Sequence, residues 1–192
     1  MNSQQNRSHD CNNYSIRDAS IEDIDSMISV IGDYYSNLGL DTPSLKNEAP
    51  WCWMSDAAIS SKVLSSENEI CGFFISRNLK KNTHLHSFFI KVDYYSKGLG
   101  TILLDHYHKD AISKNPGIET LTLHLHSKNH FAERFYVKRG YGLVLQTKRL
   151  LENNDGFGEW ARNCKEKDRW PLRKGIRLFG VDVVDLKKFN GH

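Results

Sequence analysis

The middle of the chain contains two strand-like segments joined by a glycine turn and a helix. Residues 84–92 are rich in aromatic and β-branched side chains, and residues 119–126 alternate leucine with polar residues. Between them, Gly98 and Gly100 open a segment to about Ser113 in which apolar residues recur every four positions. Two strands of one sheet joined by a crossover helix lie parallel. The pattern therefore predicts a parallel strand pair at the centre of the fold.

The flanking segments predict that the rest of the sheet is antiparallel. Ser20 and Asp23 stand in capping-box positions before apolar residues at helical spacing. The polar stretch 65–69 separates two short strands and favours a β-hairpin. We expect strands at 14–17, 63–64, 70–75, 84–92, 119–126, 141–147 and 181–186, and helices at 21–35, 46–60, 98–113 and 129–139. The predicted fold class is α+β (α/β), with a mixed, mostly antiparallel sheet of about seven strands and about four flanking helices.

Length and composition limit the chain to one domain. Its 192 residues suit a single domain over 14–192, preceded by a polar tail (1–13) that we expect to be disordered. No apolar run approaches the roughly 20 residues of a membrane span, and the N-terminus lacks the apolar stretch of a secretion signal. The four cysteines form no CxxC pair. We therefore expect reduced thiols in a cytoplasmic protein without membrane contact.

One segment stands apart from the periodic elements. Residues 151–175 show neither strand nor helix period and read as an insertion between the last two strands. From Lys148 to Arg177, nine Lys or Arg accompany five Asp or Glu. This excess fits a solvated basic face or a surface for phosphates or an acidic partner. The formal net charge of +3 is too small to indicate nucleic-acid binding, which is not expected.

The glycine turn, residues 95–101, has two interpretations when taken alone. It is a plain tight turn, or it is a phosphate site in which glycine lets the backbone approach a ligand. In the second case the N–H groups at the helix start hold a pyrophosphate, helped by the helix dipole. The stretch is no dinucleotide fingerprint, because the third glycine is missing, and no P-loop, because no GK[ST] closes it.

A second motif lies about 30 residues further on. Residues 129–141, NHFAERFYVKRGY, closely resemble the N-x-x-A-x-x-F-Y-x-x-x-G-F/Y pattern of the GCN5-related N-acetyltransferase (GNAT) superfamily. Residues 90–100 resemble the acetyl-CoA loop of that family, R/Q-x-x-G-x-G/A, although Tyr95 stands where Arg or Gln is usual. Motifs, spacing and element order agree over about residues 14–147. The resemblance implies a GNAT fold whose parallel central strands splay apart, with acetyl-CoA as cosubstrate.

The resemblance also assigns groups to the cofactor. The pantetheine arm would pair with strand backbone groups and the pyrophosphate with loop backbone groups, and Lys97 could supply the charge missing at Tyr95. By position these groups are Phe88, Ile90 and Val92 on the strand, Lys97, Gly98, Leu99, Gly100 and Thr101 in the loop, and Asn129. Tyr136 matches the tyrosine that faces the thioester sulfur and can act as general acid. Without the motif, Tyr136 would be interpreted as a core aromatic.

Two histidines are candidates for the catalytic base. His84 and His86 project from the same strand face, and an unperturbed imidazole titrates near neutrality. Their strand resembles that of arylalkylamine N-acetyltransferases, in which two histidines relay the amine proton through water. The alternative is that both are semi-buried strand residues. His124 and His126 repeat the spacing on the next strand, but the metal-free chemistry of the family argues against zinc, and no metal is expected.

Aromatic residues in the first half of the chain are candidates for the acceptor site. The expected activity is transfer of an acetyl group from acetyl-CoA to a primary amine by direct attack. A small-molecule amine is favoured over a peptide, with the insertion as a wall or lid and an aromatic lining formed by Tyr34, Tyr35, Trp51 and Trp53. Two alternatives stay open: acetylation of a protein lysine or N-terminus, and a catalytically silent acyl-CoA-binding regulator. A homodimer is also left open.

Overall fold

The structure of the chain is a computed structural model that describes residues 14–37, 39, 57–66, 69–126, 129–143 and 176–189. Three sequence predictions lie outside these residues. They are the N-terminal tail (1–13), most of the helix predicted at 46–60, with Trp51 and Trp53, and the insertion 151–175. Among the described helices, none combines the length and the apolar character needed to cross a membrane.

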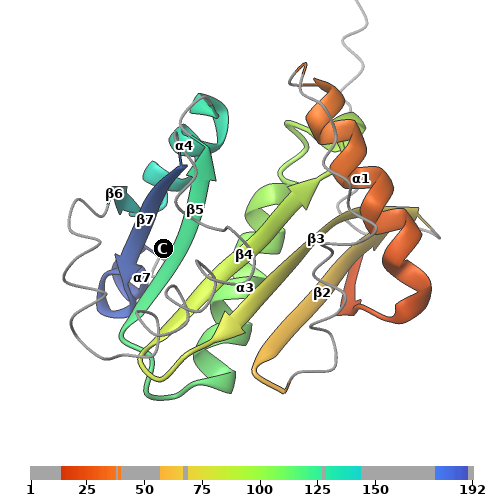
Figure 1. Cartoon of the computed structure of the whole chain (residues 1–192). Helices are drawn as coiled ribbons and strands as arrows, with labels where there is room; N and C mark the ends of the chain where they lie inside the picture. Colours follow the sequence, from red (N-terminus) through yellow and green to blue (C-terminus); the bar gives the residue numbers. More distant parts are fainter. Residues whose placement is uncertain are drawn as a thin grey trace, which may run out of the picture.

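A seven-stranded mixed sheet forms the centre of the fold (Figure 1). Its strands are β1 (Tyr14–Asp18), β2 (Ile59–Ser66), β3 (Glu69–Asn78), β4 (Asn82–Ile90), β5 (Thr120–His126), β6 (Gly142–Leu143) and β7 (Ile176–Asp182). They lie in the order β1-β2-β3-β4-β5-β7-β6. The β4–β5 pair is parallel, and the other described pairs are antiparallel. The predicted mixed sheet with a parallel central pair is thereby confirmed.

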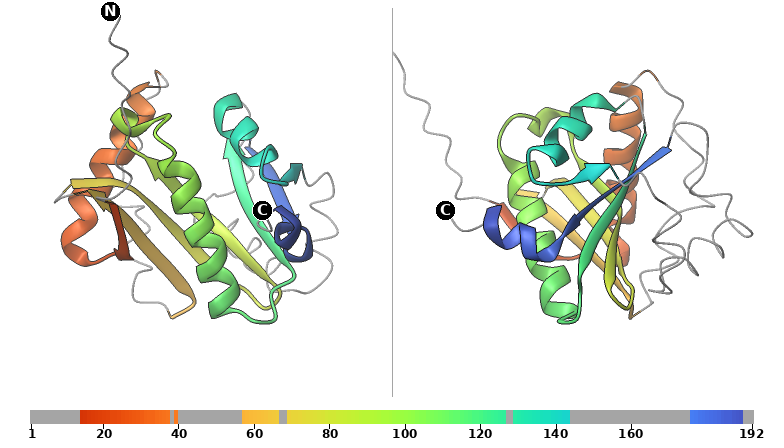
Figure 2. Two further views of the ribbon diagram at one scale, coloured as in Figure 1. Left: turned by 180° about the vertical axis from the view of Figure 1, so that it is seen from behind. Right: turned by 90° about the vertical axis from the view of Figure 1, so that its left-hand side faces the viewer.

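Helices cover both faces of this sheet. They are the short 3-10 turns η2 (Ile21–Asp23) and η4 (Val92–Tyr94) and the α-helices α1 (Ile24–Asn37), α3 (Leu99–Lys114), α4 (His130–Val137) and α7 (Val183–Phe189). The first helix, α1, packs on one face, and α3 packs on the opposite face (Figure 2). The shorter α4 shares the α3 core through Tyr136. The fold is thus a three-layer arrangement with the sheet in the middle.

Strand alternation divides the apolar residues between two cores. On β3, Phe73 faces α1 and Phe74 faces α3, because successive strand side chains point to opposite faces. Met27 and Ile31 of α1 close the smaller core and are at most 3% exposed. The larger core lies under α3 and includes Leu103, Leu104, Tyr107, Leu121, Leu123, Phe179 and Val181.

The start of the first helical segment agrees with the predicted capping signal. The Asp23 carboxylate accepts a 2.8 Å hydrogen bond from the backbone N–H of Ser20. It also pairs with both terminal nitrogens of Arg17, each at 2.7 Å. The Arg17 guanidinium holds the pKa of Asp23 down to about 2, so the carboxylate stays charged under all ordinary conditions. This ion pair fixes the turn that leads from β1 into α1.

Two boundary predictions are wrong in part. The strand expected at 181–186 ends at Asp182, and the chain continues as α7. Val183 and Leu186 are both buried and lie three residues apart, a spacing that a helix satisfies on one face. The helix predicted at 46–60 does not reach its expected end, because Ile59 already begins β2. Cross-strand pairing with β3 decides the conformation there.

Candidate active site at the splayed strands

A β-bulge lies in β4 at His86. Ser87 is opposite Ile75 of β3, whereas Leu85 is opposite Ser76, so one extra residue stands between the two pairs. The bulge reverses the alternation of the strand. Leu85 consequently packs into the α3 core, while Phe89, four residues later, packs against the α1 core.

The two central strands separate directly after this bulge. The parallel ladder joins residues 82–85 of β4 to 120–123 of β5 and goes no further within the described chain. The strand β5 keeps its ladder with β7 as far as His126. Figure 1 shows the resulting gap, which widens from the ladder toward the C-terminal ends of β4 and β5. The splayed central pair implied by the resemblance is therefore present, and Phe88 and Ile90 lie on its β4 side.

The glycine turn lies at the open end of this gap. Ser96 and Gly98 have φ angles of 60° and 82°, and α3 begins at Leu99. A left-handed backbone at Gly98 costs little because glycine has no Cβ. The helix α3 thus starts directly after this turn, with the Thr101 N–H donating to the Gly98 carbonyl at 2.9 Å, and a helix N-terminus is suited to an anion. Val92 is not part of the strand as predicted, because β4 ends at Ile90.

Gly100 has a packing role that the sequence did not indicate. A Cβ atom built on Gly100 would lie 3.3 Å from the ring of Phe135 on α4. In contrast, a Cβ atom on Gly98 would meet nothing within 4 Å among the described residues. The guanidinium of Arg139 lies over the ring of Phe135, 3.8 Å from the ring centroid. Gly100 therefore allows α4 to approach α3 closely.

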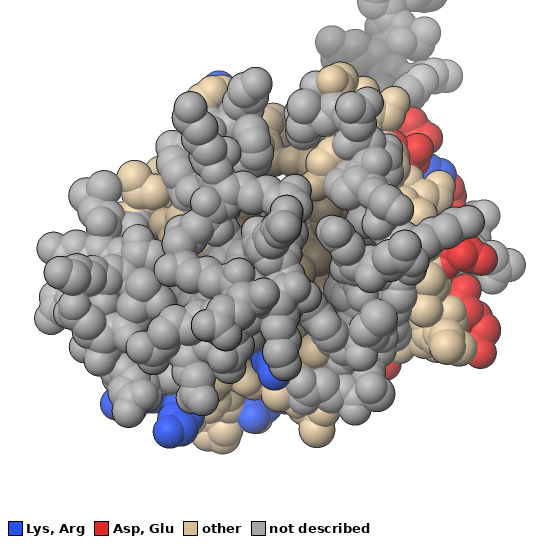
Figure 3. All heavy atoms as spheres, viewed as in Figure 1, with Lys and Arg blue, Asp and Glu red and all other residues tan. Residues whose placement is uncertain are grey.

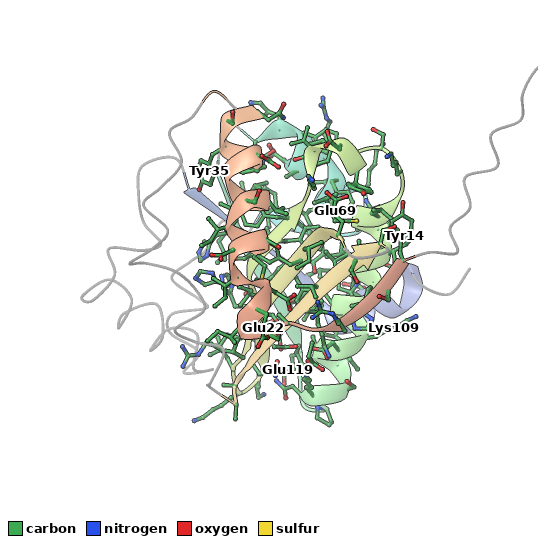
Figure 4. The ribbon with its side chains drawn as sticks, turned by 90° about the vertical axis from the view of Figure 1, so that its right-hand side faces the viewer. Tyr14, Glu22, Tyr35, Glu69, Lys109 and Glu119 are labelled. Carbon is green, nitrogen blue, oxygen red and sulfur yellow. The ribbon has the colours of Figure 1, made fainter. Side chains whose placement is uncertain are left out.

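A polar cluster anchors the loop before α3. The Tyr94 hydroxyl donates a 2.6 Å hydrogen bond to Glu69, which also pairs with Lys91. The Lys97 ammonium lies 4.7 Å from the centroid of the Tyr94 ring. Glu69 and Tyr14 lie on the flank away from α1 (Figure 4). In this arrangement Lys97 contacts an aromatic ring of its own loop.

Aromatic and amide side chains cross the mouth of the gap. The ring of Tyr95, from the loop after β4, stacks on that of Phe131 of α4, with centroids 5.9 Å apart. The Asn129 amide nitrogen donates a 2.6 Å hydrogen bond to the Tyr34 hydroxyl of α1. The Asn129 oxygen accepts from the Ala132 N–H at 3.0 Å and so caps α4. Asn129 is thus a helix cap and a link to α1.

Tyr136 lies under the gap on the α3 side. It is 5% exposed and packs edge-on against Phe88 of β4, with centroids 6.1 Å apart. Burial raises the pKa of Tyr136 well above its ordinary value, with a smaller contribution from Tyr34. Its hydroxyl is therefore protonated at neutral pH and able to donate a hydrogen bond.

Three imidazoles meet on the opposite face, at the point where the strands separate. His84 Nε2 lies 3.0 Å from His124 Nδ1, and the two ring centroids are 4.6 Å apart. The His86 ring lies 6.5 Å from that of His84. His84 Nδ1 lies 2.9 Å from the Thr122 hydroxyl, which also contacts Asn82. The prediction that His84 and His86 share a face agrees with this arrangement.

Burial keeps these imidazoles uncharged. Desolvation lowers the pKa of His84 well below its ordinary value, and the neighbouring His124 and His86 lower it further. The pKa values of His86 and His124 are both lowered to about 4, chiefly by burial. At neutral pH each imidazole is therefore neutral and has one unprotonated ring nitrogen. The described residues contain no group of three or more side chains suited to hold a metal ion.

The sequence did not single out His124, Thr122 or Asn82 as site residues. The sequence feature that could have identified them was the predicted parallel pairing of the two strands that each carry a His-x-His pattern. In that pairing His84 is opposite Thr122, which places His124 diagonally next to His84. The side chain of His126 and the predicted acceptor residues Trp51 and Trp53 lie outside the described part of the chain. Tyr35 lies near the C-terminal end of α1 (Figure 4), and its ring centroid is 5.4 Å from that of Tyr34.

Comparison with known proteins gives a family and a fold. The sequence profile of the acetyltransferase (GNAT) family matches residues 25–141, more than half of the 192-residue chain. No curated protein matches the chain in sequence.

Three solved structures share the fold at low sequence identity. The ribosomal-protein-S18-alanine N-acetyltransferase from Escherichia coli is 15% identical, with a TM-score of 0.63 over 88% of this chain and 94% of that one. PaiA N-acetyltransferase from Thermoplasma acidophilum, solved with coenzyme A, is 17% identical, with a TM-score of 0.64 over 88% and 98%. An acetyltransferase from Streptococcus agalactiae is 12% identical, with a TM-score of 0.70 over 89% and 99%.

Proposed function

The chain belongs to the acetyltransferase (GNAT) family and is an N-acetyltransferase with an acyl-CoA cosubstrate; on that premise we propose that it acetylates a small primary amine by direct attack on acetyl-CoA. The observation that carries the proposal is the end of the β4–β5 ladder at Leu85, beyond which β4 continues to Ile90 and leads into the glycine turn. Thioester and amine can meet in the gap so formed. Holding both reactants there makes the attack effectively intramolecular.

The cofactor would lie along β4 and end at α3. Strand backbone at Phe88 and Ile90 lies beyond the β5 ladder and could pair with pantetheine amides. The loop from Lys97 to Thr101 would hold the pyrophosphate at the helix N-terminus. Val92 belongs to the connecting turn and would contact the chain between these two parts. Asn129 would contact the cofactor from the β5 side, and it would have to share its amide with Tyr34.

Tyr136 is suited to stabilise the leaving thiolate. Its hydroxyl is buried beside Phe88, and its raised pKa keeps the proton in place before reaction. A thiol has an ordinary pKa of about 8.5, so full proton transfer from Tyr136 to a thiolate is uphill. The hydroxyl would therefore stabilise the leaving sulfur by donating a hydrogen bond as negative charge develops on it, and the thiolate would take its proton from solvent.

The cluster that contains His84 and His86 would take up the amine proton. An alkyl ammonium has a pKa of about 10.4, whereas that of His86 is about 4, so direct transfer between them costs about 9 kcal/mol. The cluster is consequently a poor base toward the free ammonium. The cluster can instead accept a proton from the amine nitrogen once the neutral amine has attacked the thioester, because the attack makes that N–H acidic. The amine would thus bind in its neutral form.

The surroundings of α1 favour a small cationic or aromatic amine. Tyr34 packs edge-on against Phe89 at a centroid distance of 5.1 Å, and Tyr35 adjoins it. The helix α1 carries two aspartates and neither Lys nor Arg. Acidic side chains gather along the α1 flank of the face in Figure 3. Such a flank attracts an amine before it loses its proton. Trp51 and Trp53 remain acceptor-site predictions.

A thermal unfolding experiment tests the cofactor first. Acetyl-CoA and coenzyme A should raise the melting temperature, and NAD should leave it unchanged, because only a ligand of the native state stabilises it. A thiol-release assay should then show turnover with alkyl or aryl amines and little with peptides. Turnover confined to peptides would reject the small-amine proposal, and no stabilisation by either CoA form would reject the cofactor assignment.

A further inference from the structure

We propose that His124 receives the proton released by the acceptor amine. A buried chain of three side chains, Asn82, Thr122 and His84, fixes which nitrogen of His124 can receive it. The inference rests on the proposed function, because it assigns the proton of that reaction. His124 is the first residue of β5 beyond the parallel ladder, and His86 holds the same place on β4. His124 therefore lies where the strands begin to separate, on the face opposite Tyr136.

The hydrogen-bonded chain of side chains begins at the fully buried amide of Asn82. Asn82 is 0% exposed and Thr122 is 1% exposed. The Asn82 nitrogen donates to Thr122 Oγ1 at 2.9 Å, and Asn82 Oδ1 lies 3.2 Å from the same hydroxyl. An amide oxygen only accepts, so the single hydroxyl hydrogen of Thr122 points to Asn82. Toward any other neighbour, Thr122 Oγ1 can then only accept.

This direction determines the tautomer of His84. His84 Nδ1 lies 2.9 Å from Thr122 Oγ1 and must be the donor in that contact. Because burial keeps the His84 imidazole neutral, its other nitrogen, Nε2, carries no hydrogen and accepts. The partner of Nε2 is His124 Nδ1, 3.0 Å away, which must therefore donate. In neutral His124 the basic nitrogen is consequently Nε2.

The hydrogen-bonded chain gives His84 and His124 different roles. Both ring nitrogens of His84 take part in the chain, one toward Thr122 and one toward His124. His84 is therefore a positioning residue, and His124 Nε2 is the proton acceptor. His124 is part-buried, whereas His84 is only 1% exposed, so His124 is the better placed of the two to meet a substrate or a bridging water.

The step balances in atoms and charge. The amine lone pair forms the new C–N bond, and one proton of the resulting ammonium passes to Nε2 of His124, directly or through one water. The C–S bond then breaks, and the Tyr136 hydroxyl donates a hydrogen bond to the leaving thiolate. The His124 imidazolium releases its proton to solvent, and the thiolate takes one proton from solvent. The products are the N-acetyl amine and coenzyme A.

Among the described residues, titratable groups near His124 lie on β4 and β3. His84 and His86 of β4 lie beside it, and the pKa of His86 is lowered by burial, by His124 and by the charge of Arg77 on β3. His86 Nδ1 lies 3.3 Å from the hydroxyl of Ser87, the next residue of its own strand. The hydrogen-bonded chain that starts at Asn82 and orients the ring of His124 passes through His84.

Nitrogen NMR of the unaltered chain tests the tautomer directly. Long-range ¹H–¹⁵N correlations distinguish an imidazole protonated at Nδ1 from one protonated at Nε2. We expect His124 and His84 to be protonated at Nδ1 at neutral pH. Thr122→Val should abolish this preference in His124, whereas Thr122→Ser should keep it. A His124 protonated at Nε2 in the unaltered chain would overturn the inference.

Kinetics test the role in turnover. His124→Gln should lower kcat for the amine about 100-fold or more, with an unchanged Kd for acetyl-CoA. The loss should be smaller at about pH 9, where hydroxide can accept the proton. The matched control is His106→Gln on α3, which should keep the parent rate. If His124→Gln keeps the parent rate, the inference is wrong, and a loss of rate in His86→Gln would then assign the proton to His86. An unaltered chain that releases no thiol with any amine would instead reject the proposed function.

Discussion

The amide nitrogen of Asn129 lies 2.6 Å from the hydroxyl oxygen of Tyr34, and this bond ties the start of α4 to the end of α1. The two residues are 95 positions apart in sequence. The bond lies on the α1 side of the gap between β4 and β5. It couples a helix cap to the aromatic group beside Phe89.

A double-mutant cycle should reveal this coupling. Asn129→Ala removes both the cap and the bond, at a cost of about 2 kcal/mol in unfolding free energy. Tyr34→Phe removes only the bond and should cost about 1 kcal/mol. The double variant should lose less than the sum, by about 1 kcal/mol, in urea unfolding. Strictly additive losses would show that the bond contributes nothing.

Gly100 and Gly98 should respond differently to alanine. Gly100→Ala places a methyl group 3.3 Å from the Phe135 ring, so it should lower stability by pushing α4 away from α3. Phe135→Leu should partly restore stability in the double variant. Gly98→Ala has room for its methyl group but strains a backbone at φ 82°, at a cost of about 1 to 2 kcal/mol.

Acetyl-CoA titration separates these two glycines further. Folded Gly98→Ala should bind acetyl-CoA more weakly, because the loop relaxes away from its left-handed geometry. Equal stability losses in the two glycine variants, with no rescue by Phe135→Leu, would contradict the packing role of Gly100.

Tyr136→Phe should lower turnover without weakening cofactor binding. The substitution keeps the ring contacts with Phe88 and Tyr141 and removes the only proton donor of the side chain. We expect kcat to fall about 100-fold, with the Kd of acetyl-CoA unchanged by calorimetry. Tyr107→Phe, which removes a buried hydroxyl bonded to the Thr83 carbonyl, is the control and should lower stability alone. A parent-like rate for Tyr136→Phe would exclude the acid role.

Stability should fall as the pH drops from 6.5 toward 4. His86, His108 and His124 have pKa values lowered from 6.5 to about 4 by burial. Below pH 6.5 the unfolded chain binds protons that the native chain does not, so acid favours unfolding. For His108, which is 3% exposed, the full loss is about 3 kcal/mol.

Urea unfolding at a series of pH values checks this dependence. The unfolding midpoint of the parent should decrease steadily between pH 6.5 and about 4. His108→Gln cannot charge and should show a weaker decrease, although it disturbs the 2.9 Å contact between His108 and the Tyr141 hydroxyl. A midpoint that stays constant over this range would show that the histidines titrate normally.

The sequence by itself determined the order of the elements and the kind of site. The strand, glycine turn, helix and strand over 84–126 predicted a parallel pair, because a helix that crosses over the sheet returns the chain to the edge where the first strand began. Gly98 marked the left-handed turn, and the spacing of residues 129–141 carried the family resemblance. These features are local, so propensity and spacing suffice to read them.

Only the tertiary structure decided which side chains meet. The bulge at His86 depends on the register between β3 and β4, and it sends Phe89 to the face opposite Leu85. The contact between His84 and His124 depends on how two parallel strands align across 40 positions of sequence. Register and bulges are set by the packing of distant segments, and a single residue of shift would reverse every side chain of a strand. For that reason composition and periodicity identified the histidines, and the fold determined the partner of each.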